Sequence, residues 1–275
     1  MTVLIIGAEP AGLFAAAEFA RHGVPTRLVE RDAKMHRRIV SRLADGRRFL
    51  IGDAAHLSSA FGGEGLNAAL HDGYDLAWKA ALVMHGHAHR SPLDDYAIER
   101  AIADRHALDI SDQVHRAVMG IAGIVRERGE PPPPSAPNPA AAALFGNARA
   151  MLDIDYAGSP LVADHAPAGT ADAGPRPGQR YPDWTELKGT SHQLLAFGPV
   201  ADVEALARLE RRWAGRVAVA RDPALDPAWA GVGAGGVVLV RPDGHVGFRA
   251  LAADPTALAA LDRHLAAYLV PAPAA

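Results

Sequence analysis

The sequence predicts an α/β protein in two parts, a βαβ unit at the N-terminus and a smaller α/β domain at the C-terminus. At the start, residues 2–6 form a short β-rich apolar run, of the kind buried on both faces in a parallel sheet. A glycine-containing turn, an alanine-rich helix over 13–22 and a second strand over 26–30 follow. From residue 178 onward short strands alternate with helices, and the Pro-Asp-Gly at 242–244 separates two apolar runs as a hairpin turn does.

Between these parts the sequence predicts further elements and a linker. Residues 47–51 read as a third strand, 66–84 as an amphipathic helix, and 92–128 as a helical stretch with a break near 120–123. Prolines at 131–134, 137 and 139 cannot be helical and mark a linker. In the C-terminal part we expect strands over 194–197, 216–220, 237–240 and 246–249, and helices over 203–213 and 256–269.

The composition excludes several classes of function. The chain has 275 residues, no cysteine and a formal net charge of −3. Without cysteine there is no disulfide, thiolate metal site or cysteine nucleophile. A mildly acidic chain with no basic block does not predict nucleic-acid binding, and no apolar run is long enough to predict a membrane span. Because residues 1–6 lack a basic region and Glu9 interrupts the apolar run, we expect no signal peptide and a cytoplasmic protein.

The turn after the first strand, Gly7-Ala8-Glu9-Pro10-Ala11-Gly12, follows the dinucleotide-binding pattern in part. That pattern places glycine at positions one, three and six, for the tight turn, the approach of the diphosphate and helix–strand packing. Two of the three glycines are present. Glu30, 18 positions after Gly12, ends the second strand, where a carboxylate holds a ribose hydroxyl. The alternative is a βαβ unit that binds no nucleotide.

Glu9 occupies the position of the second glycine and has the wrong charge for a diphosphate. Two like charges about 4 Å apart near a surface repel by roughly 1 to 4 kcal/mol. We therefore predict that Glu9→Gly tightens dinucleotide binding, and equal or weaker affinity of the variant in a calorimetric titration would contradict this.

A second motif resembles the glycine–aspartate motif of the class A FAD-dependent aromatic hydroxylases, the p-hydroxybenzoate hydroxylase superfamily. The residues that carry the resemblance are the runs 46–56 and 62–67, followed by Asp72, Leu76, Trp78 and Lys79, and by Tyr96, Glu99 and Arg100. The resemblance implies that Asp53 binds the ribityl chain of FAD and that the backbone of 62–67 lies along the pyrimidine end of the isoalloxazine. A glycine-rich turn that opens a helix directs free N–H groups at negative charge on reduced flavin. The alternative for Asp53 is an ordinary helix or turn cap.

Together the motifs imply a set of cofactor-binding residues and a reaction. The residues are Gly7, Ala8, Pro10, Ala11, Gly12, Glu30, Arg31, Asp53, Gly62, Gly63, Gly65, Leu66 and Asn67. The resemblance implies FAD as cofactor, NADH or NADPH as electron donor, and a small phenolic or polyketide-like aromatic substrate. No side chain presents itself as a catalytic residue, and no metal site is expected.

The C-terminal runs 176–183 and 236–249 resemble the thioredoxin-like tail of phenol hydroxylases and bacterial polyketide hydroxylases. The expected fold is therefore a truncated Rossmann-like FAD-binding domain over 1–128, a linker over 129–175 and a thioredoxin-like α/β domain over 176–275. Without cysteine this last domain has no disulfide-exchange role; we expect a structural role or a contribution to a homo-oligomer.

The middle of the family pattern is missing. Only 22 residues separate Glu30 from Asp53, too few for the substrate-domain sheet and the second Asp-Gly motif of the family. Ser59 also stands where the family often has a proline. Because oxygen chemistry on flavin needs a closed, dry pocket, we predict no turnover or uncoupled NAD(P)H oxidation with release of peroxide. The alternative is an inactive remnant that works as a binding or oligomerisation module.

Three weaker candidates have ordinary structural alternatives. His85, His87 and His89 could share one face of an extended segment as metal ligands, but they also suit a solvated helix end. His56 reads as a proton relay or as a hydrogen-bonded histidine at a helix start. Another candidate is an anion patch, for which the alternative is a solvated loop; its members are Arg37, Arg38, Arg42, Arg47 and Arg48.

Overall fold

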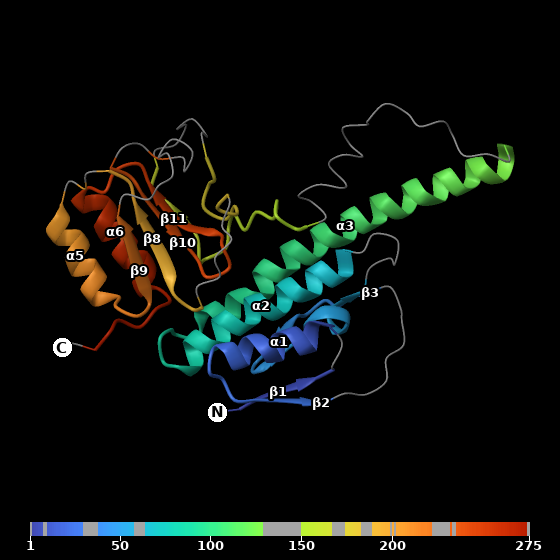
Figure 1. Cartoon of the computed structure of the whole chain (residues 1–275), viewed down its shortest axis with the longest axis horizontal. Coiled ribbons are helices and arrows are strands. Elements are labelled where there is room, and N and C mark those ends of the chain that lie inside the picture. The colour runs from blue at the N-terminus through green and yellow to red at the C-terminus, as the bar shows by residue number, and fades with distance from the viewer. Residues whose placement is uncertain are drawn as a thin grey trace.

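The computed structural model confirms an α/β fold (Figure 1). One part consists of an N-terminal βαβ unit with two long helices, and the other is a C-terminal domain built on a five-stranded sheet. The structure describes residues 2–7, 10–29, 38–57, 64–128, 150–166, 174–182, 189–198, 200, 202–221, 232 and 235–273. Three helices, α1, α2 and α3, lie between a two-stranded parallel sheet and the C-terminal domain. Among the described residues, none of the helices combines the length and apolar character needed to cross a membrane.

The N-terminal βαβ unit forms as predicted. Strand β1 (Val3–Ile6) and strand β2 (Thr26–Val29) pair in parallel, with Val3 opposite Thr26, and helix α1 (Pro10–Arg21) connects them. Gly23, at φ +67°, follows α1 in a left-handed conformation that favours glycine and turns the chain toward β2. This is the Rossmann-like unit in its smallest form.

The expectation that the first strand is buried on both faces is wrong. Ile5 is 8% exposed and faces α1, whereas Leu4 is 59% and Ile6 is 74% exposed. Alternate residues of a strand point to opposite faces, and the described part of the chain covers only one face of this two-stranded sheet. An apolar strand suited to the middle of a larger sheet thus presents one apolar face to solvent.

The segment between the βαβ unit and α2 consists of short elements. Strand β3 (Arg38–Ile39) pairs with β6 (His56–Leu57), and β4 (Ala44–Asp45) pairs with β5 (Arg48–Phe49). The predicted strand over 47–51 is therefore reduced to the two residues of β5. A single 3-10 turn, η1 (Gly52–Ala54), follows and carries the glycine–aspartate pair.

Two long helices come next. Helix α2 (Glu64–Met84) packs on α1 through small residues; a Cβ on Gly73 would lie 3.3 Å from both the Ala11 carbonyl oxygen and the Ala15 Cβ. Helix α3 (Ser91–Arg128) packs along α2 and continues without a break through residues 120–123. The predicted break is wrong, because a glycine inside a helix costs only about 1 kcal/mol and does not by itself end it.

The C-terminal domain has the predicted thioredoxin-like order of a βαβ unit followed by a hairpin and a helix. The elements are β8 (His192–Ala196), α5 (Val203–Arg212), β9 (Val217–Arg221), β10 (Val237–Val240), β11 (Val246–Ala250) and α6 (Pro255–Ala266). Strands β8 and β9 are parallel, and β10 and β11 form the hairpin predicted at 242–244. Asp202 and Asp254 cap α5 and α6 by accepting from backbone N–H groups.

Residues 150–166 lie within the expected linker and are ordered parts of both cores. Strand β7 (Ala163–Asp164) adds to β11 at the edge of the five-stranded sheet. Met151, Ile154 and Tyr156 are buried and pack in one cluster with alanines of α2 and α3. The division into 1–128, 129–175 and 176–275 stays a prediction.

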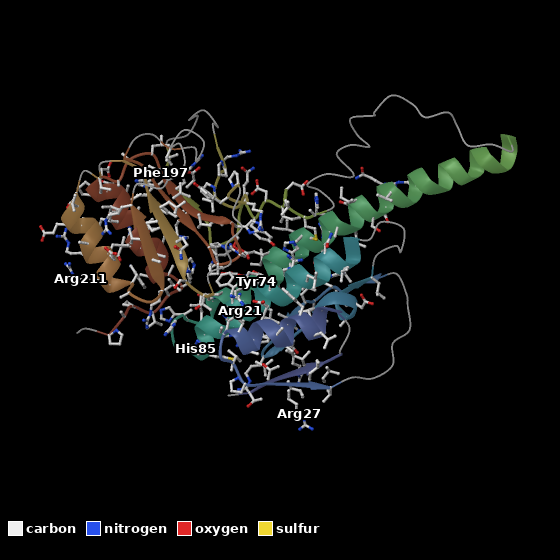
Figure 2. All side chains as sticks on the ribbon, viewed as in Figure 1. Arg21, Arg27, Tyr74, His85, Phe197 and Arg211 are labelled. Atoms are coloured by element: carbon white, nitrogen blue, oxygen red, sulfur yellow. The ribbon has the colours of Figure 1, made fainter. Side chains whose placement is uncertain are left out.

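The N-terminal helices and the C-terminal domain meet over a continuous core. Tyr74 and Trp78 of α2 belong to the same buried cluster as Leu239 of β10. The Tyr74 hydroxyl donates to the Pro242 carbonyl oxygen at 2.9 Å, and Figure 2 shows Tyr74 between the helices and the C-terminal sheet. Helix α2 therefore contributes buried side chains to the cores of both parts of the molecule.

Candidate functional site

The turn that opens α1 has the geometry of a nucleotide-binding turn. Gly7 leaves β1 at φ +111°, and its N–H donates to the Val29 carbonyl oxygen at 2.7 Å. A Cβ on Gly12 would lie 1.8 Å from the Gly7 carbonyl oxygen, so this position requires glycine. A Cβ on Gly7 would meet no atom of the described residues within 4 Å.

The glycine–aspartate pair lies directly against this turn. A Cβ on Gly52 would be 2.7 Å from the Ala11 Cβ, and Gly52 itself has φ +55°. Only glycine fits both the conformation and the contact. Asp53, the next residue, is exposed in the first turn of η1. The structure thus brings together two motifs that are 40 residues apart in the sequence.

These features fit FAD. An extended dinucleotide needs an open glycine turn at a helix N-terminus for its diphosphate and an acceptor for its ribityl hydroxyls. Gly7 and Gly12 form the glycine turn, and the exposed carboxylate of Asp53 is suited to accept hydrogen bonds from the ribityl hydroxyls. Helix α2 begins at Glu64, and the described residues of its first turn include Gly65, the half-exposed Leu66 and Asn67.

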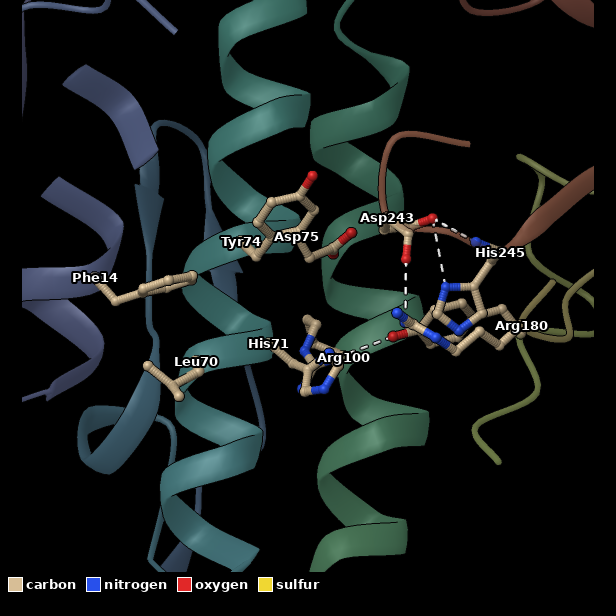
Figure 3. Close-up of a pocket in the computed structure, with 10 residues that line it drawn as sticks. Phe14, Leu70, His71, Tyr74, Asp75, Arg100, Arg180, Asp243 and His245 are labelled. Atoms are coloured by element: carbon tan, nitrogen blue, oxygen red, sulfur yellow. Dashed lines mark hydrogen bonds and ion pairs between the residues drawn. The ribbon is translucent and has the colours of Figure 1, made fainter. Parts of the chain in front are cut away.

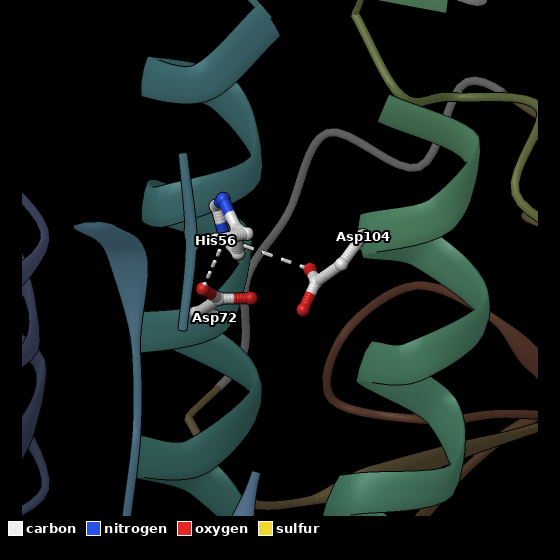
Figure 4. A group of neighbouring side chains, drawn as sticks. All are labelled: His56, Asp72 and Asp104. Atoms are coloured by element: carbon white, nitrogen blue, oxygen red, sulfur yellow. Dashed lines mark hydrogen bonds and ion pairs between the residues drawn. The ribbon is translucent and has the colours of Figure 1, made fainter. Parts of the chain in front are cut away.

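A buried carboxylate, Asp72, holds the glycine–aspartate pair in place; Figure 4 shows it beside His56 and Asp104. Its Oδ2 accepts from the Gly52 N–H at 2.8 Å and lies 2.8 Å from the His56 Nε2. Its Oδ1 accepts from the Arg100 Nε at 2.6 Å. Helices α2 and α3 are therefore connected through one carboxylate to the backbone of η1.

The electrostatics of this cluster follow from burial and from the central arginine. Burial alone would raise the pKa of Asp72, but Arg100 and the bond to His56 outweigh it and hold the pKa below its usual value. Burial, together with the charge of Asp72, raises the pKa of Asp104 to about 7. For His56, burial lowers the pKa, and the hydrogen bond to Asp72 together with the charges of Asp72 and Asp104 more than reverses this.

Two acidic groupings have the ligand spacing of a metal site: His56 with Asp72 and Asp104, and Asp75 with Glu99 and Asp243. Each grouping already has buried cations in contact with its members. Arg100 contacts Asp72 at 2.6 Å and Asp104 at 3.1 Å, and Lys79 and Arg241 contact the second grouping. These cations supply the positive charge that an ion would bring, so both groupings are structural ion networks.

Some predicted site residues lie outside the described residues. These are Ala8, Glu30, Arg31, Gly62 and Gly63, together with Glu9 and Ser59. The structure places Gly7, Pro10, Ala11, Gly12 and Asp53 in one region, and their contact with FAD stays a prediction. Asp72 was part of the second motif but had no role in the sequence analysis. An aspartate on the apolar face of a predicted helix indicates a buried carboxylate with a hydrogen-bonding or charged partner.

Most of the weaker candidates lie within the described residues. His56 is hydrogen-bonded to Asp72 and lies in strand β6, not at a helix start. In the histidine tract, the His85 and His87 rings are 5.8 Å apart, and no three metal-binding atoms of the described tract come within 4.8 Å of one another. Arg42 and Arg48 pair with Asp45 at an exposed hairpin, which is a solvated loop. Arg37 lies outside the described residues.

Two family models match the chain. A model described as an FAD binding domain matches residues 1–38 and 32–111, in two pieces that meet within the short stretch between Glu30 and Asp53. A model described as aromatic-ring hydroxylase, C-terminal, matches residues 174–272.

Individual relatives and structures agree with these matches. A flavin-dependent monooxygenase of Mycobacteroides abscessus is 31% identical over 223 residues, which cover 78% of this chain and 39% of the relative. Aklavinone 12-hydroxylase DnrF of Streptomyces peucetius is 32% identical over 57% of this chain and 30% of its own length. The flavin-dependent monooxygenase PieE in complex with FAD and substrate superimposes with a TM-score of 0.61 at 27% identity, covering 83% of this chain and 49% of its own.

A second structure, a ternary complex of aklavinone-11 hydroxylase with FAD and aklavinone, gives a TM-score of 0.60 at 31% identity, over 82% of this chain and 44% of its own. The chain therefore spans less than half the length of these relatives.

Proposed function

We propose that this chain, which belongs to the class A FAD-dependent aromatic hydroxylases, binds FAD at the junction of β1, α1 and η1. The observation that carries the proposal is the contact of Gly52 with Ala11. It holds the two parts of the FAD site together although the chain between them is short. The relatives whose structures contain FAD support the same cofactor here.

Each part of the site has a defined task in this proposal. The turn from Gly7 to Gly12, with the N-terminus of α1, binds the diphosphate. Asp53 accepts hydrogen bonds from the ribityl hydroxyls, and Asp72 keeps Asp53 in position through the Gly52 N–H. The first turn of α2, from Gly65 to Asn67, lies beside the pyrimidine end of the ring. When bound, FAD supplies two-electron transfer and reaction with oxygen.

For the reaction, we propose oxidation of NADH or NADPH that is poorly coupled to hydroxylation. Glu30 and Asp53 are separated by 22 residues, and the exposed Leu4 and Ile6 show that one face of the N-terminal sheet is uncovered by the described residues. An open site favours release of hydrogen peroxide over transfer of oxygen to a ring. If the chain retains a substrate, its relatives support an aromatic or polyketide compound; one of their structures holds aklavinone.

Substitution of Asp53 tests the proposed cofactor site. We expect Asp53→Ala to weaken FAD binding by about tenfold to a hundredfold in a fluorescence titration, as expected for lost hydrogen bonds to a charged group. Asp45→Ala, which removes another exposed aspartate, is the matched control and should leave FAD affinity unchanged. Equal FAD affinity in the Asp53 variant and the control would contradict the assignment.

A further inference from the structure

A pocket of about 170 Å³ lies between α1, α2, α3 and the C-terminal hairpin, outside the proposed FAD site (Figure 3). One end is apolar and is formed by Phe14 and Leu70; the other is polar and is formed by His71, Arg180 and His245. None of these five residues belongs to either FAD motif. A cavity of about 150 Å³ is large enough for a benzene ring.

The two carboxylates that line the pocket, Asp75 and Asp243, already have ion-pair partners. Asp75 accepts from the Lys79 ammonium at 2.8 Å. Asp243 accepts from the Arg241 guanidinium, and both partners are buried. Lys79 and Arg241 also contact Glu99, so both pocket carboxylates belong to one buried ion network that does not include Arg180.

Arg180 is a cation outside this network. Its Nη1 donates at 3.4 Å to the main-chain oxygen of Asp243, and it forms no ion pair with a carboxylate of the described residues. Main-chain pairing fixes Arg180 in place. Arg180 forms an antiparallel β-bridge with His245, and the N–H of Tyr181 donates to the Gly244 carbonyl oxygen. Arg180 is therefore a positioned cation at the pocket.

His245 adds a ring nitrogen that lacks a partner in the described part of the chain, while its Nδ1 lies 3.4 Å from the Asp243 Oδ1. His245 is 3% exposed, and its Nε2 has no hydrogen-bond partner among the described residues. Burial, with a smaller effect of the charges of Arg100, His245 and Arg180, lowers the pKa of His71 to about 4. His71 is therefore neutral at pH 7.

We propose that this pocket binds a small organic carboxylate, with the acid group at Arg180 and the apolar body toward Phe14 and Leu70. Arginine binds carboxylates through paired, charge-assisted hydrogen bonds, and a buried imidazole without a partner is satisfied by the same anion. The Tyr156 ring, 4.5 Å from the His245 ring between centroids, closes the polar end. Such a ligand contacts α1, α2 and the C-terminal domain at once.

Benzoate is the probe that tests this proposal, with benzamide as its uncharged isostere. Isothermal titration of the full chain should show saturable binding of one benzoate, with benzamide weaker by about tenfold or more. We expect Arg180→Gln to weaken benzoate binding by a similar factor. Arg176→Gln removes an exposed arginine of the same segment that does not line the pocket, and it should bind benzoate like the unaltered chain.

A second variant and a second ligand keep the test decisive. Leu70→Trp fills the apolar end and should abolish benzoate binding without changing any charge. Equal binding of benzoate and benzamide, undiminished binding by Arg180→Gln, or binding of inorganic phosphate in place of benzoate would each overturn the proposal. Thermal unfolding of each variant shows that it is folded. The titration is done without flavin, so its outcome is independent of whether the chain binds FAD.

Discussion

Glu99 of α3 accepts two hydrogen bonds from Arg241 at the end of β10, with Nη1–Oε1 at 2.5 Å and Nη2–Oε2 at 2.8 Å. Both side chains are fully buried. Lys79 of α2 donates to the same carboxylate at 2.6 Å. Burial would raise the pKa of Glu99, but Arg241 and Lys79 lower it to about 2. One carboxylate thus connects the two long helices to the C-terminal domain.

Glu99→Gln should destabilise the protein strongly. The substitution removes the counter-charge of two buried cations, and breaking a buried ion pair from one side costs about 3 to 5 kcal/mol. Urea unfolding followed by circular dichroism measures the loss. Asp94→Asn breaks an exposed pair with Arg90 and is the control, with an expected change of about 0 to 1 kcal/mol. Losses of equal size in the two variants would contradict a structural role for Glu99.

Asp72→Asn should lower both stability and FAD affinity. The amide leaves Arg100 without full charge compensation and weakens the bond that holds Gly52, so we expect a loss of about 2 to 4 kcal/mol in unfolding free energy. Asp53→Asn is the matched variant, because its exposed side chain should affect FAD affinity with a stability change within about 0.5 kcal/mol. Unchanged FAD affinity in Asp72→Asn would show that the carboxylate does not position the site.

Buried histidines predict that stability falls in mild acid. Burial lowers the pKa of His192 to about 3, with Arg241 adding to the effect, and burial lowers that of His264 to about 4. The unfolded chain binds these protons near pH 6.5, whereas the folded chain does not until the pH is much lower. The stabilisation is therefore complete above pH 6.5 and is lost as the pH falls toward 4.

His192→Gln tests this directly. The His192 Nε2 lies 3.1 Å from the Tyr268 hydroxyl, and glutamine retains a polar group there. Between pH 4 and 6.5, the unfolding free energy of the variant should change by about 1 to 3 kcal/mol less than that of the unaltered chain. His89→Gln, at an exposed position, should keep the full pH dependence. A His192 variant with the pH profile of the unaltered chain would refute the prediction.

Flavin-loaded protein should oxidise NADH or NADPH with one peroxide released per molecule consumed. Each turnover converts NAD(P)H, O₂ and a proton to NAD(P)⁺ and H₂O₂, and an uncovered site gives peroxide an exit before a ring is attacked. Consumption of the nicotinamide is measured by absorbance, and peroxide with a peroxidase-coupled dye. The unaltered chain without flavin is the control. A hydroxylated product formed in proportion to NAD(P)H would show that the site is closed and coupled.

The sequence predicted the elements that depend on local pattern. The βαβ unit, the C-terminal hairpin and helix α2 follow from apolar period, glycine position and turn chemistry, all of which lie within a few residues. The exposure of Leu4 and Ile6 was not predictable, because the burial of a strand depends on what covers it from elsewhere in the chain. Helix α3 passes through Gly120 and Gly123 because its other residues outweigh two weak helix formers.

The site was predicted in part for the same reason. Gly7, Gly12 and Asp53 stand in recognisable motifs, so their types and spacing indicated a flavin site. The hydrogen-bonded cluster that holds these residues in place could not be predicted, because Asp72, His56 and Arg100 meet only after α2 and α3 pack side by side. The pocket at Arg180 likewise requires the C-terminal domain to lie against α2.

The central claim is that the contact of Gly52 with Ala11 assembles a working FAD site in a chain that lacks the middle of its family pattern. The most direct measurement is the amount of flavin released on denaturing the purified protein, by visible absorbance, per polypeptide, after incubation with excess FAD. The account predicts a ratio close to one. A ratio near zero would contradict it and would favour the alternative of a binding or oligomerisation module.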